Sequence, residues 1–489
     1  MNSMQVLILL IGSMAIVSCV VDGSETNLTK VPASEVLVKI NRLEPVMYNH
    51  VVIEGDLDLS HLSLPSISKP TEKSASKRAL ELSDNAHIVE SQIVITNSEI
   101  HGDVKFNNTI FNGIVDFAFT DIDGDANLCA VDFNKGANFK EAKFNRFVNL
   151  MTSKFKGDAN FEGARFSKYA DFSSVMFGKY ASFKEAQFSD YADLMDVAFT
   201  DNANFESTDF EKSDFRNSNF LKEAKFLFSK FGKKAEFGNT TFGGYTDFRK
   251  TDFLEDVNFE EANFEEDATF ADAKFSGVTE FWKSSFNSAT DFSGSKFIGA
   301  ATVYFTGSRF NGSVYLNDIE LTNINVEWNS IKNQLVCNEP AYILLIKNFK
   351  EHGQYDDADN CYYQYQSWMQ SRAPLLSLSK LVHIVSWASC GYGVRWYYTI
   401  FFAMLAIFLF GLYFYQKGRA LGSRLTNMLT FSTAMLLNLP KDWCEVLCGA
   451  IRYRNYVENN KYMIILERIL GWCLVIILIN TLSRIMIRY

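Results

Sequence analysis

Phenylalanine recurs along the middle of this chain with a spacing that neither a helix nor a plain strand produces. Between residues 159 and 188, the steps between successive Phe residues alternate between five and six, so the pattern has a period of eleven. These residues are Phe161, Phe166, Phe172, Phe177, Phe183 and Phe188. The rhythm continues to Phe297, interrupted by a run of pure fives from Phe205 to Phe220. Such a repeat limits the possible architectures before any local element is assigned.

A small residue precedes most of these Phe residues by two positions, and a polar residue lies between the two. Ala159 and Phe161 form one such pair. Side chains alternate along an extended segment, so the small residue and the Phe both face inward while the polar residue faces outward. Two or three polar residues then turn a corner, and four sides close one square coil of about 22 residues. We expect the small residues to leave room for Phe rings to stack in columns.

The unit small–polar–Phe–polar–polar resembles the pentapeptide-repeat family, whose units run A-(D/N)-(L/F)-x-x. The resemblance implies an all-β fold, a right-handed quadrilateral β-helix, over residues 106–315. The uneven spacing between Phe297 and Phe310 predicts a distorted last coil. Because each coil buries its core only by stacking on its neighbours, the two ends of such a solenoid need caps.

The segments on either side of the repeats are interpreted as these caps. Residues 33–105 are expected to form an N-terminal cap and the first coils, which are filled by aliphatic residues, with a polar protruding loop at 65–87. Residues 316–373 are expected to form a helical hairpin cap, broken at Gly353, with Pro340 in the first turn of its first helix.

The C-terminal tail differs from the repeats in charge and hydropathy. Residues 106–315 carry 23 Lys and Arg against 32 Asp and Glu, whereas residues 374–489 carry 12 against 4. An acidic body joined to a basic, apolar tail indicates a soluble domain tethered to a membrane. Apolar residues at helical spacing with flanking Lys380 and Arg395 predict an interfacial helix over 374–395.

Residues 396–489 are expected to form a two-helix membrane domain. The first helix spans 396–415, twenty uncharged residues with aromatic ends, and the second spans about 464–486. Asn480 in the second helix is expected to bond a neighbouring helix. The short apolar segment 425–439 between the two helices is too short to span a bilayer and is pore-helix-like.

Two independent features predict the side of the membrane on which the repeats lie. Residues 1–19 read as a signal peptide or signal anchor, with Cys19 as a candidate for lipidation. The loop 416–461 carries seven Lys and Arg against three Asp and Glu, which indicates a cytoplasmic loop by the positive-inside rule. Both features predict a protein of the cell membrane with its repeat domain outside the cytoplasm.

The tail also resembles the two-helix ion-channel domain fused to some membrane-bound pentapeptide-repeat proteins of bacteria and archaea. The resemblance covers about 391–489 and includes "LTFST", which begins at Leu429. In channels of that kind, a pore helix precedes a TVGYG-type filter whose backbone carbonyls hold the ion. Here the filter position reads "AMLLNLPKD", which has no Gly, and the only "GYG" of the chain, at 391–393, lies before the first membrane helix.

These features favour a membrane-anchored, extracytoplasmic scaffold for interaction or structure, without catalysis. The alternative is an ion channel or channel-derived subunit with a degenerate, non-TVGYG filter. The expected partners are membrane lipid, an unknown protein along the β-helix faces and, as an open alternative, a second copy joined through the membrane helices. No nucleic acid is expected, because the acidic excess of the rod is mild and the rod lies outside the cytoplasm.

No residue is predicted to be catalytic, cofactor-binding or metal-binding. The six His are scattered, and HExxH, GxSxG and phosphate-binding loops are absent from the sequence. The many Asp and Glu of the repeats are interpreted as a solvated outer face. A disulfide between Cys337 and Cys361 and two buried thiols remain open alternatives, and Cys444 and Cys448 are expected to be packing residues. Sequons that could be glycosylated in an exported chain begin at Asn27, Asn107, Asn239 and Asn311.

Overall fold

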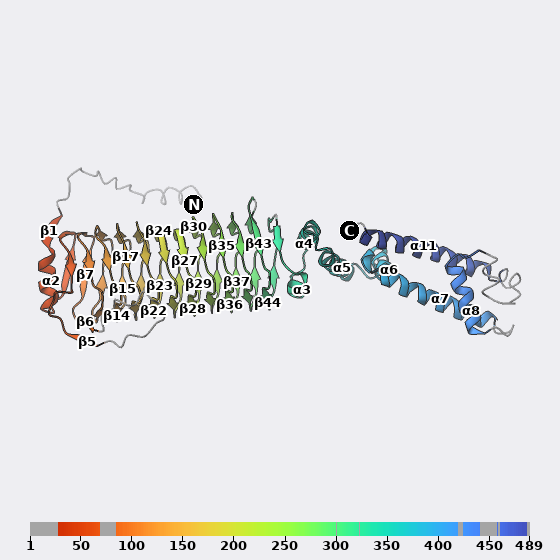
Figure 1. Ribbon diagram of the computed structural model, residues 1–489, viewed down its shortest axis with the longest axis horizontal. Helices are drawn as coiled ribbons and strands as arrows, with labels where there is room; N and C mark the ends of the chain where they lie inside the picture. The colour runs from red at the N-terminus through yellow and green to blue at the C-terminus, as the bar shows by residue number, and fades with distance from the viewer. Residues whose placement is uncertain are drawn as a thin grey trace, which may run out of the picture.

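The computed structural model shows a long rod followed by a group of helices (Figure 1). It describes residues 28–68, 85–299, 301–321, 323–418, 424–440, 457 and 460–486. Several predictions made from the sequence lie outside these residues. They are the signal segment 1–19 with Cys19, the sequon at Asn27, Cys444, Cys448 and most of the loop 416–461.

The rod is a parallel β-solenoid of about 13 turns, which confirms the predicted fold class. Within the described residues, its strands form two 12-stranded sheets and one 22-stranded sheet. The first and last strands of the 12-stranded sheets are β2 (Val46–Asn49), β45 (Val314–Tyr315), β5 (Ser66–Ser68) and β44 (Arg309–Phe310). The 22-stranded sheet covers two faces, because β24 (Gln187–Asp193) and β27 (Asp209–Asp214) each run across both. The cross-section therefore has four faces, as expected for stacked quadrilateral coils.

Coil length follows the spacing of the Phe residues. In a regular coil Phe111 pairs with Phe133, so each strand meets its equivalent after two of the eleven-residue periods. The run of pure fives makes one coil shorter by a single position, so that Ala198 pairs with Asn219. The extra residue of the preceding coil is absorbed by a register shift between Phe188 and Tyr191. At the far end Phe286 pairs with Phe310 across a longer coil, which confirms the predicted distorted last coil.

Alternate corners of the coil are tight turns with a left-handed residue. At one of them the Ala142 amide donates to the Phe139 carbonyl at 3.0 Å, and Glu141 has φ +51°. A positive φ at the third residue is the geometry of a type II turn. The same conformation recurs every eleven residues, at Glu141, Thr152, Gly163, Ser174 and Glu185. Two kinds of corner therefore alternate around the coil. One pair of successive sides with its two corners takes eleven residues, which gives the period of the sequence.

The interior of the rod is filled by columns of stacked Phe rings, as the small residues predicted. One column runs through Phe183, Phe205, Phe226 and Phe248, with ring centroids 4.6–4.9 Å apart and nearly parallel planes. Rings of different columns meet edge to face, as Phe226 and Phe237 do at 86°. Offset stacks and perpendicular contacts are the arrangements that aromatic quadrupoles favour, so the columns interlock.

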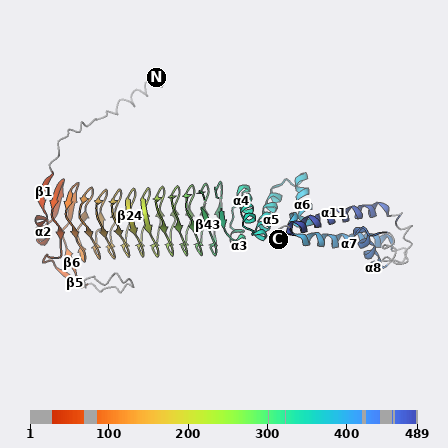
Figure 2. The ribbon, with the colours of Figure 1, turned by 45° about the horizontal axis from the view of Figure 1, so that its top comes forward.

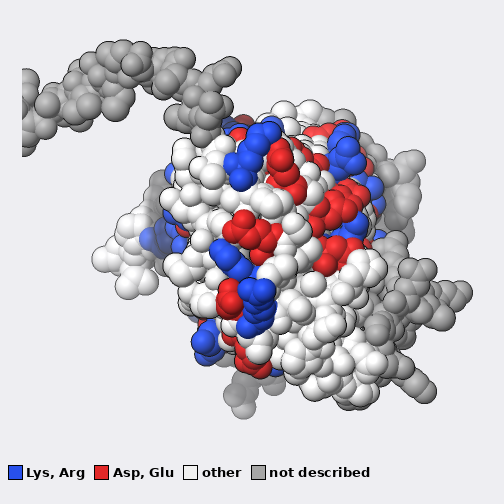
Figure 3. All heavy atoms as spheres, turned by 90° about the vertical axis from the view of Figure 1, so that its left-hand side faces the viewer, with Lys and Arg blue, Asp and Glu red and all other residues white. Residues whose placement is uncertain are grey.

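The N-terminal end of the rod is covered by helix α2 (Ala33–Asn41), which the sequence analysis did not predict as a helix. Val36 and Ile40 of α2 are fully buried in the rod's core. Figure 3 views this end and shows Lys and Arg interspersed with Asp and Glu. In the first strands of the rod, Lys30 and Glu54 form an ion pair whose Nζ and Oε1 lie 2.6 Å apart.

The segment 65–87, predicted as a protruding loop, contains strands at both ends. β5 pairs in antiparallel fashion with β6 (Asn85–Val89), which itself continues a face of the solenoid. The polar composition of this segment therefore misled the sequence analysis at its borders, and its middle, 69–84, lies outside the described residues.

The C-terminal end of the rod is covered by three helices, α3 (Trp328–Ile331), α4 (Glu339–Glu351) and α5 (Tyr355–Arg372). Gly353 separates α4 from α5. The side chain of Asn348 on α4 bonds both the N–H and the carbonyl of Ile324, at 3.0 and 2.6 Å. This contact satisfies both backbone groups of Ile324 in the last strand, β46 (Asn323–Asn325), and an uncovered strand edge at this place would be open to pairing with another chain.

Cys337 and Cys361 do not form a disulfide. The Sγ of Cys337 lies 3.2 Å from the hydroxyl of Tyr342. Cys361 is fully buried in α5, and this burial raises the pKa of its thiol. Of the two alternatives left open by the sequence, the structure has two free thiols, of which Cys361 is buried and Cys337 is partly buried.

The described residues of the C-terminal part include four helices, which Figure 2 shows beyond the end of the rod. They are α6 (Leu378–Cys390), α7 (Trp396–Gly418), α8 (Leu425–Leu436) and α11 (Lys461–Met486). A short 3-10 turn, η2 (Gly391–Gly393), joins α6 to α7. Figures 1 and 2 show α7 and α11 leading away from the rod, with α8 near their far end.

Candidate functional site

Two helices of the described chain are long and apolar enough to cross a membrane. They cover Trp396–Lys417 and Lys461–Ser483, with mean hydropathies of 1.9 and 2.2. At 1.5 Å per residue, the 23-residue α7 is about 35 Å long, enough for a bilayer core of about 30 Å. Leu405, Leu409 and Ile476 point away from the hairpin and are about half exposed. Such side chains need a lipid or protein environment.

Helix α8 packs between α7 and α11. The Ser432 hydroxyl lies 3.0 Å from the Ile407 carbonyl of α7 and also within hydrogen-bond distance of the Glu467 carboxyl of α11. Glu467 is fully buried, and its Oε2 has no hydrogen-bond partner within the described parts of the chain. Hence one hydroxyl on α8 links both long helices through polar groups at an otherwise apolar interface.

The C-terminal end of α8 reaches the middle of both long helices. Leu436 packs against Ala406 and Leu474. Its carbonyl oxygen lies so close to Gly471 that a Cβ at that position would overlap it. Asn438 follows in a left-handed conformation, φ +52°, and its side chain donates to the Arg468 carbonyl at 3.1 Å. Most of the segment 425–439, predicted as pore-helix-like, thus forms α8 (Leu425–Leu436), which ends near the middle of the two long helices.

Helix α6 presents apolar side chains to solvent on the side of the hairpin nearest the rod. Leu378, Leu381, Val382 and Val385 are each more than half exposed. Ser377 caps the helix by accepting from the Lys380 amide at 3.1 Å. This arrangement fits a helix that lies in a membrane interface, the role predicted for residues 374–395.

A row of three carboxylates, Asp171, Asp193 and Asp214, runs along one face of the rod and is buried. These residues pair across neighbouring coils and have exposed fractions of 6%, 2% and 3%. The sequence analysis interpreted such residues as solvated, and for this acidic row that interpretation is wrong. Burial, and next to it the charge of Asp171, raises the pKa of the Asp193 carboxyl.

Aromatic rings and an Arg side chain cover the acidic row. The Tyr169 hydroxyl donates to Asp193 at 3.1 Å, and the Tyr191 hydroxyl donates to Asp214 at 3.0 Å. The Arg216 guanidinium binds Asp214 with both Nε and Nη2. The sequence carries only part of the signal, a Tyr directly before the small residue and, at Asp214, an Arg two residues after the Asp. Each Tyr contacts the Asp of the next coil, so the local pattern alone does not show which carboxyl is covered.

The described residues contain no group of three His, Cys, Asp or Glu placed to hold a metal ion. His101 has two acidic neighbours, with its Nε2 lying 3.1 Å from Glu99 and 3.6 Å from Asp123. These side chains lie on the exposed surface and form ion-pair contacts there. The expectation that the chain has no catalytic, cofactor-binding or metal-binding residues stays a prediction.

The comparison with protein families agrees with the geometry of the rod. Residues 139–187, 183–230 and 229–274 match the family of pentapeptide repeats (9 copies). The β-helix is a pentapeptide-repeat domain. No curated protein and no solved structure matches the chain. The coils continue on both sides of the matched segment, because the same parallel pairing runs from β3 (Val51–Glu54) to β43 (Thr302–Tyr304).

Proposed function

We propose that this protein is a membrane-anchored scaffold, with a rigid pentapeptide-repeat rod outside the cytoplasm that binds a protein partner along its faces. The main support is the continuity of one apolar core from Val31 in the first strand to Cys361 in α5. The same core extends without interruption from the rod into α4 and α5, the helices next to the two apolar spans. Anchoring in lipid by those spans is part of the same proposal.

The orientation is supported by the charges of the sequence. The loop 416–461 joins the C-terminal end of α7 to the N-terminal end of α11, and the described parts of these two helix ends lie far from the rod (Figure 1). The sequence of this loop carries the excess of Lys and Arg described above. A cytoplasmic loop places the rod on the opposite side of the bilayer.

Labelling with a membrane-impermeant thiol reagent tests this orientation in intact cells. A single Cys replaces Ser423 in the loop or, as the matched control, the exposed Leu221 on the rod, each in a background without the native cysteines. We expect Leu221→Cys to be labelled and Ser423→Cys to be protected until the cells are permeabilised. The reverse pattern would place the rod in the cytoplasm and overturn the proposal.

A second candidate function is favoured by the position of α8. A half-length helix whose C-terminal end reaches the middle of a two-helix hairpin is the arrangement of a pore helix, and its dipole there favours a cation. The following residues include no Gly up to Pro440, so a filter of freed carbonyls is not supported. Ion flux from proteoliposomes decides this point: we expect none above protein-free vesicles, and a steady flux would favour a channel-derived subunit.

The membrane helices also support self-association as part of the proposal. Phe401, Met404 and Phe408 lie along one exposed side of α7, and Asn480 lies on the exposed surface of α11. A polar residue on a lipid-facing surface is a common means of helix–helix contact in membranes. Cross-linking through a Cys at Met404 in bilayers would show a dimer if two copies meet there, whereas only monomer would refute this contact.

A further inference from the structure

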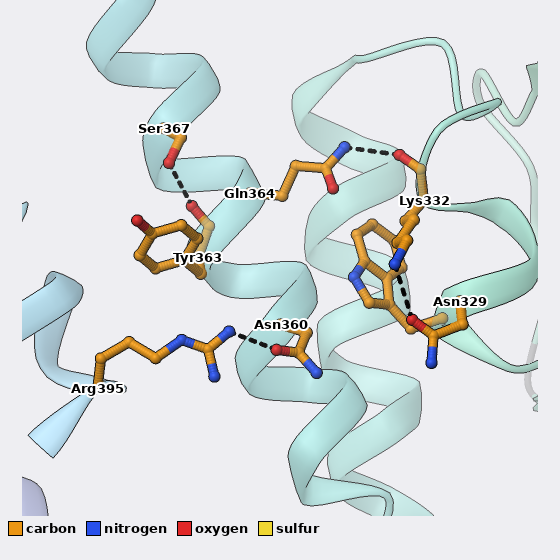
Figure 4. Close-up of a pocket in the computed structure, with 8 residues that line it drawn as sticks. Asn329, Lys332, Asn360, Tyr363, Gln364, Ser367 and Arg395 are labelled. Atoms are coloured by element: carbon orange, nitrogen blue, oxygen red, sulfur yellow. Dashed lines mark hydrogen bonds between the residues drawn. The ribbon is translucent and has the colours of Figure 1, made fainter. Parts of the chain in front are cut away.

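A cavity of about 370 Å³ lies at the junction between the rod's helical cap and the membrane helices (Figure 4). Helices α3 and α5 form its walls, and the turn that leads into α7 closes one side. The lining residues are Trp328, Asn329, Lys332, Asn360, Tyr363, Gln364, Ser367 and Arg395. We call this cavity the junction pocket.

Arg395 is placed in the junction pocket by the turn that contains the "GYG" motif of 391–393. Gly391 has φ +53°, and a Cβ at this position would lie 2.6 Å from both Cβ and Cγ of Arg395. The arginine stem therefore passes directly over a position that only Gly can occupy. Tyr392 of the same turn is buried, and its hydroxyl donates to Gln370 of α5. The motif thus acts as a support for Arg395 in this chain.

The guanidinium of Arg395 is held by neutral groups. Its Nη2 donates to Asn360 Oδ1 at 2.5 Å, and it lies over the ring of Tyr363 at 5.3 Å. Tyr363 is held in turn by Trp387, whose Nε1 donates to the tyrosine hydroxyl at 2.9 Å. These contacts orient the planar cation without neutralising its charge.

Lys332 supplies a second cation from the opposite wall (Figure 4). Its Nζ donates to Asn329 Oδ1 at 3.0 Å, and its carbonyl accepts from Gln364 at 2.7 Å. The lining contains amide and hydroxyl groups besides these two cations, and neither Asp nor Glu is among the lining residues. Two cations with neutral donors and no carboxylate are the chemistry that binds a phosphate.

The position of the junction pocket in the fold indicates where this phosphate comes from. Arg395 directly precedes Trp396, the first residue of an apolar span, and Trp396 and Tyr397 are exposed there as aromatic residues are at a membrane interface. The apolar side chains of α6 lie on the same end of the hairpin. Once the spans are inserted, the pocket stands at the depth of the lipid headgroups.

We propose that the junction pocket binds the phosphate of an anionic phospholipid headgroup between Arg395 and Lys332. A zwitterionic lipid fits less well, because its ammonium group finds no carboxylate in the lining and the face of Tyr363 is already covered by Arg395. The proposal rests on the membrane anchoring proposed above. It adds a specific lipid that fixes the rod's cap to the bilayer surface.

The test uses the full chain in nanodiscs of phosphatidylcholine with one fifth phosphatidylglycerol. Native mass spectrometry after detergent release counts the phosphatidylglycerol that stays bound. We expect the double variant Arg395→Gln, Lys332→Gln to retain at least tenfold less phosphatidylglycerol than the native protein. Arg372→Gln is the matched control, since this guanidinium lies over Trp368 at 4.3 Å and does not line the pocket, so it should retain the lipid.

Two further experiments test the geometry of the phosphate site and the source of the phosphate. Arg395→Lys keeps the charge but loses the two-pronged donor, so partial retention is expected, and full loss with an unchanged melting temperature would contradict the phosphate geometry. Glycerol phosphate in pure phosphatidylcholine discs tests for a soluble ligand. If it binds with the same affinity as the lipid, the pocket takes a soluble phosphate ester and the lipid assignment is wrong.

Failure of anchoring and failure of the lipid site give different results. A chain that does not enter nanodiscs of any composition would overturn the proposed function. A chain that enters nanodiscs but retains equal phosphatidylglycerol in the native protein and in the folded double variant would overturn the lipid site alone. Circular dichroism of each variant shows that it is folded.

Discussion

Single Phe residues of the pentapeptide-repeat domain are not equivalent, although they look alike in the sequence. Phe226 is fully buried between Phe205 and Phe248, with ring centroids 4.9 and 4.6 Å away. Phe228, two residues later, is half exposed at a corner.

We expect Phe226→Ala to destabilise the rod by about 3–5 kcal/mol, because it removes a large buried ring and leaves a cavity inside a column. Phe228→Ala is the control and should cost less than about 1 kcal/mol, since the side chain contacts mainly Lys250, whose Nζ lies 5.2 Å from the ring centroid. The midpoint of denaturant unfolding measures both effects. Equal shifts for the two variants would contradict the column model.

The acidic row gives a prediction that depends on pH. The raised pKa of Asp193 means that the folded state disfavours its carboxylate, so stability is lost as the pH rises from the unfolded pKa through the folded one. Asp193→Asn should therefore raise the melting temperature at pH 7, and the gain should vanish below about pH 4. Asn149 and Asn258 occupy the same ladder position in other coils, so the amide fits there.

Asp214→Asn is the matched control for this prediction. It breaks the paired contact with Arg216, so it should lower the melting temperature at pH 7. Melting curves of both variants between pH 3 and pH 8 are the measurement. A lower melting temperature for Asp193→Asn at pH 7 would show that Asp193 stabilises the fold as an anion.

The inward Phe residues could be predicted at the residue scale, whereas the buried Asp residues could not. Spacing alone assigns Phe226 to the interior because inward positions repeat every five or six residues. The polar residue between the small residue and the Phe faces outward in every unit. Whether water reaches it depends on the side chains that lie beside it in space. For Asp193 and Asp214 these neighbours include Tyr rings from adjacent coils, which a local pattern does not reveal.

At the scale of elements, the contact between α8 and α11 depends on a close backbone approach at Gly471. Gly471→Ala places a methyl group where the Leu436 carbonyl lies, so α8 must move. We expect a loss of about 1–3 kcal/mol. We also expect faster thiol labelling of a Cys placed at the buried Ala434 of α8.

Gly411→Ala is the control for this displacement. A Cβ there would meet the flexible end of Leu429 first, at 2.7 Å, and that end can rotate away. Labelling of the Ala434→Cys reporter should therefore stay close to the rate in the native background. Equal labelling of both glycine variants would show that α8 is not held by Gly471.

The elements of the C-terminal part were largely expected from apolar runs and helix breaks, whereas their contacts were not. The apolar run beginning at Trp396 and the break at Gly353 are local features of the sequence. The helix at Ala33–Asn41 was missed because its short apolar stripe, Val36 and Ile40, was interpreted as part of a cap without assigned structure. The link from Ser432 to Glu467 joins two separate helices across a long stretch of chain, which no spacing rule predicts.

At the scale of the whole molecule, the rod should tolerate a change of length by one complete coil. Lys230 pairs with Asp252, so deletion of residues 230–251 joins equivalent positions and keeps every later strand on its face. We expect this variant to fold with a rod about 5 Å shorter, as measured by small-angle X-ray scattering.

Deletion of residues 230–249 is the control, because it stops two positions short of a complete coil. It shifts the following strand by the same two positions against the coil below, so inward rings no longer meet their columns. We expect a clear drop in melting temperature for this variant alone. Similar melting of both deletions would show that the coils do not need a common register.

The overall architecture was predictable because it follows from a sequence repeat. The junction pocket could not be predicted, because its residues do not belong to any repeat. The same unit recurs along the whole rod, so a wrong assignment of a single residue does not change the predicted fold. Lys332 and Arg395 come from separate elements that lie far apart in the sequence, and only the packing of α5 against the turn before α7 brings them to one cavity.

The uninterrupted core has a mechanical meaning. About 13 turns at about 4.8 Å each make a beam of roughly 60 Å, with no seam between its tip and the cap at its base. A force applied at the tip is then transmitted as torque to the short segment between α5 and α6, at Pro374. In the proposed membrane-anchored scaffold, a partner bound at the distal end would be held at a fixed distance from the bilayer, and a pull on that partner would reach the base of the rod.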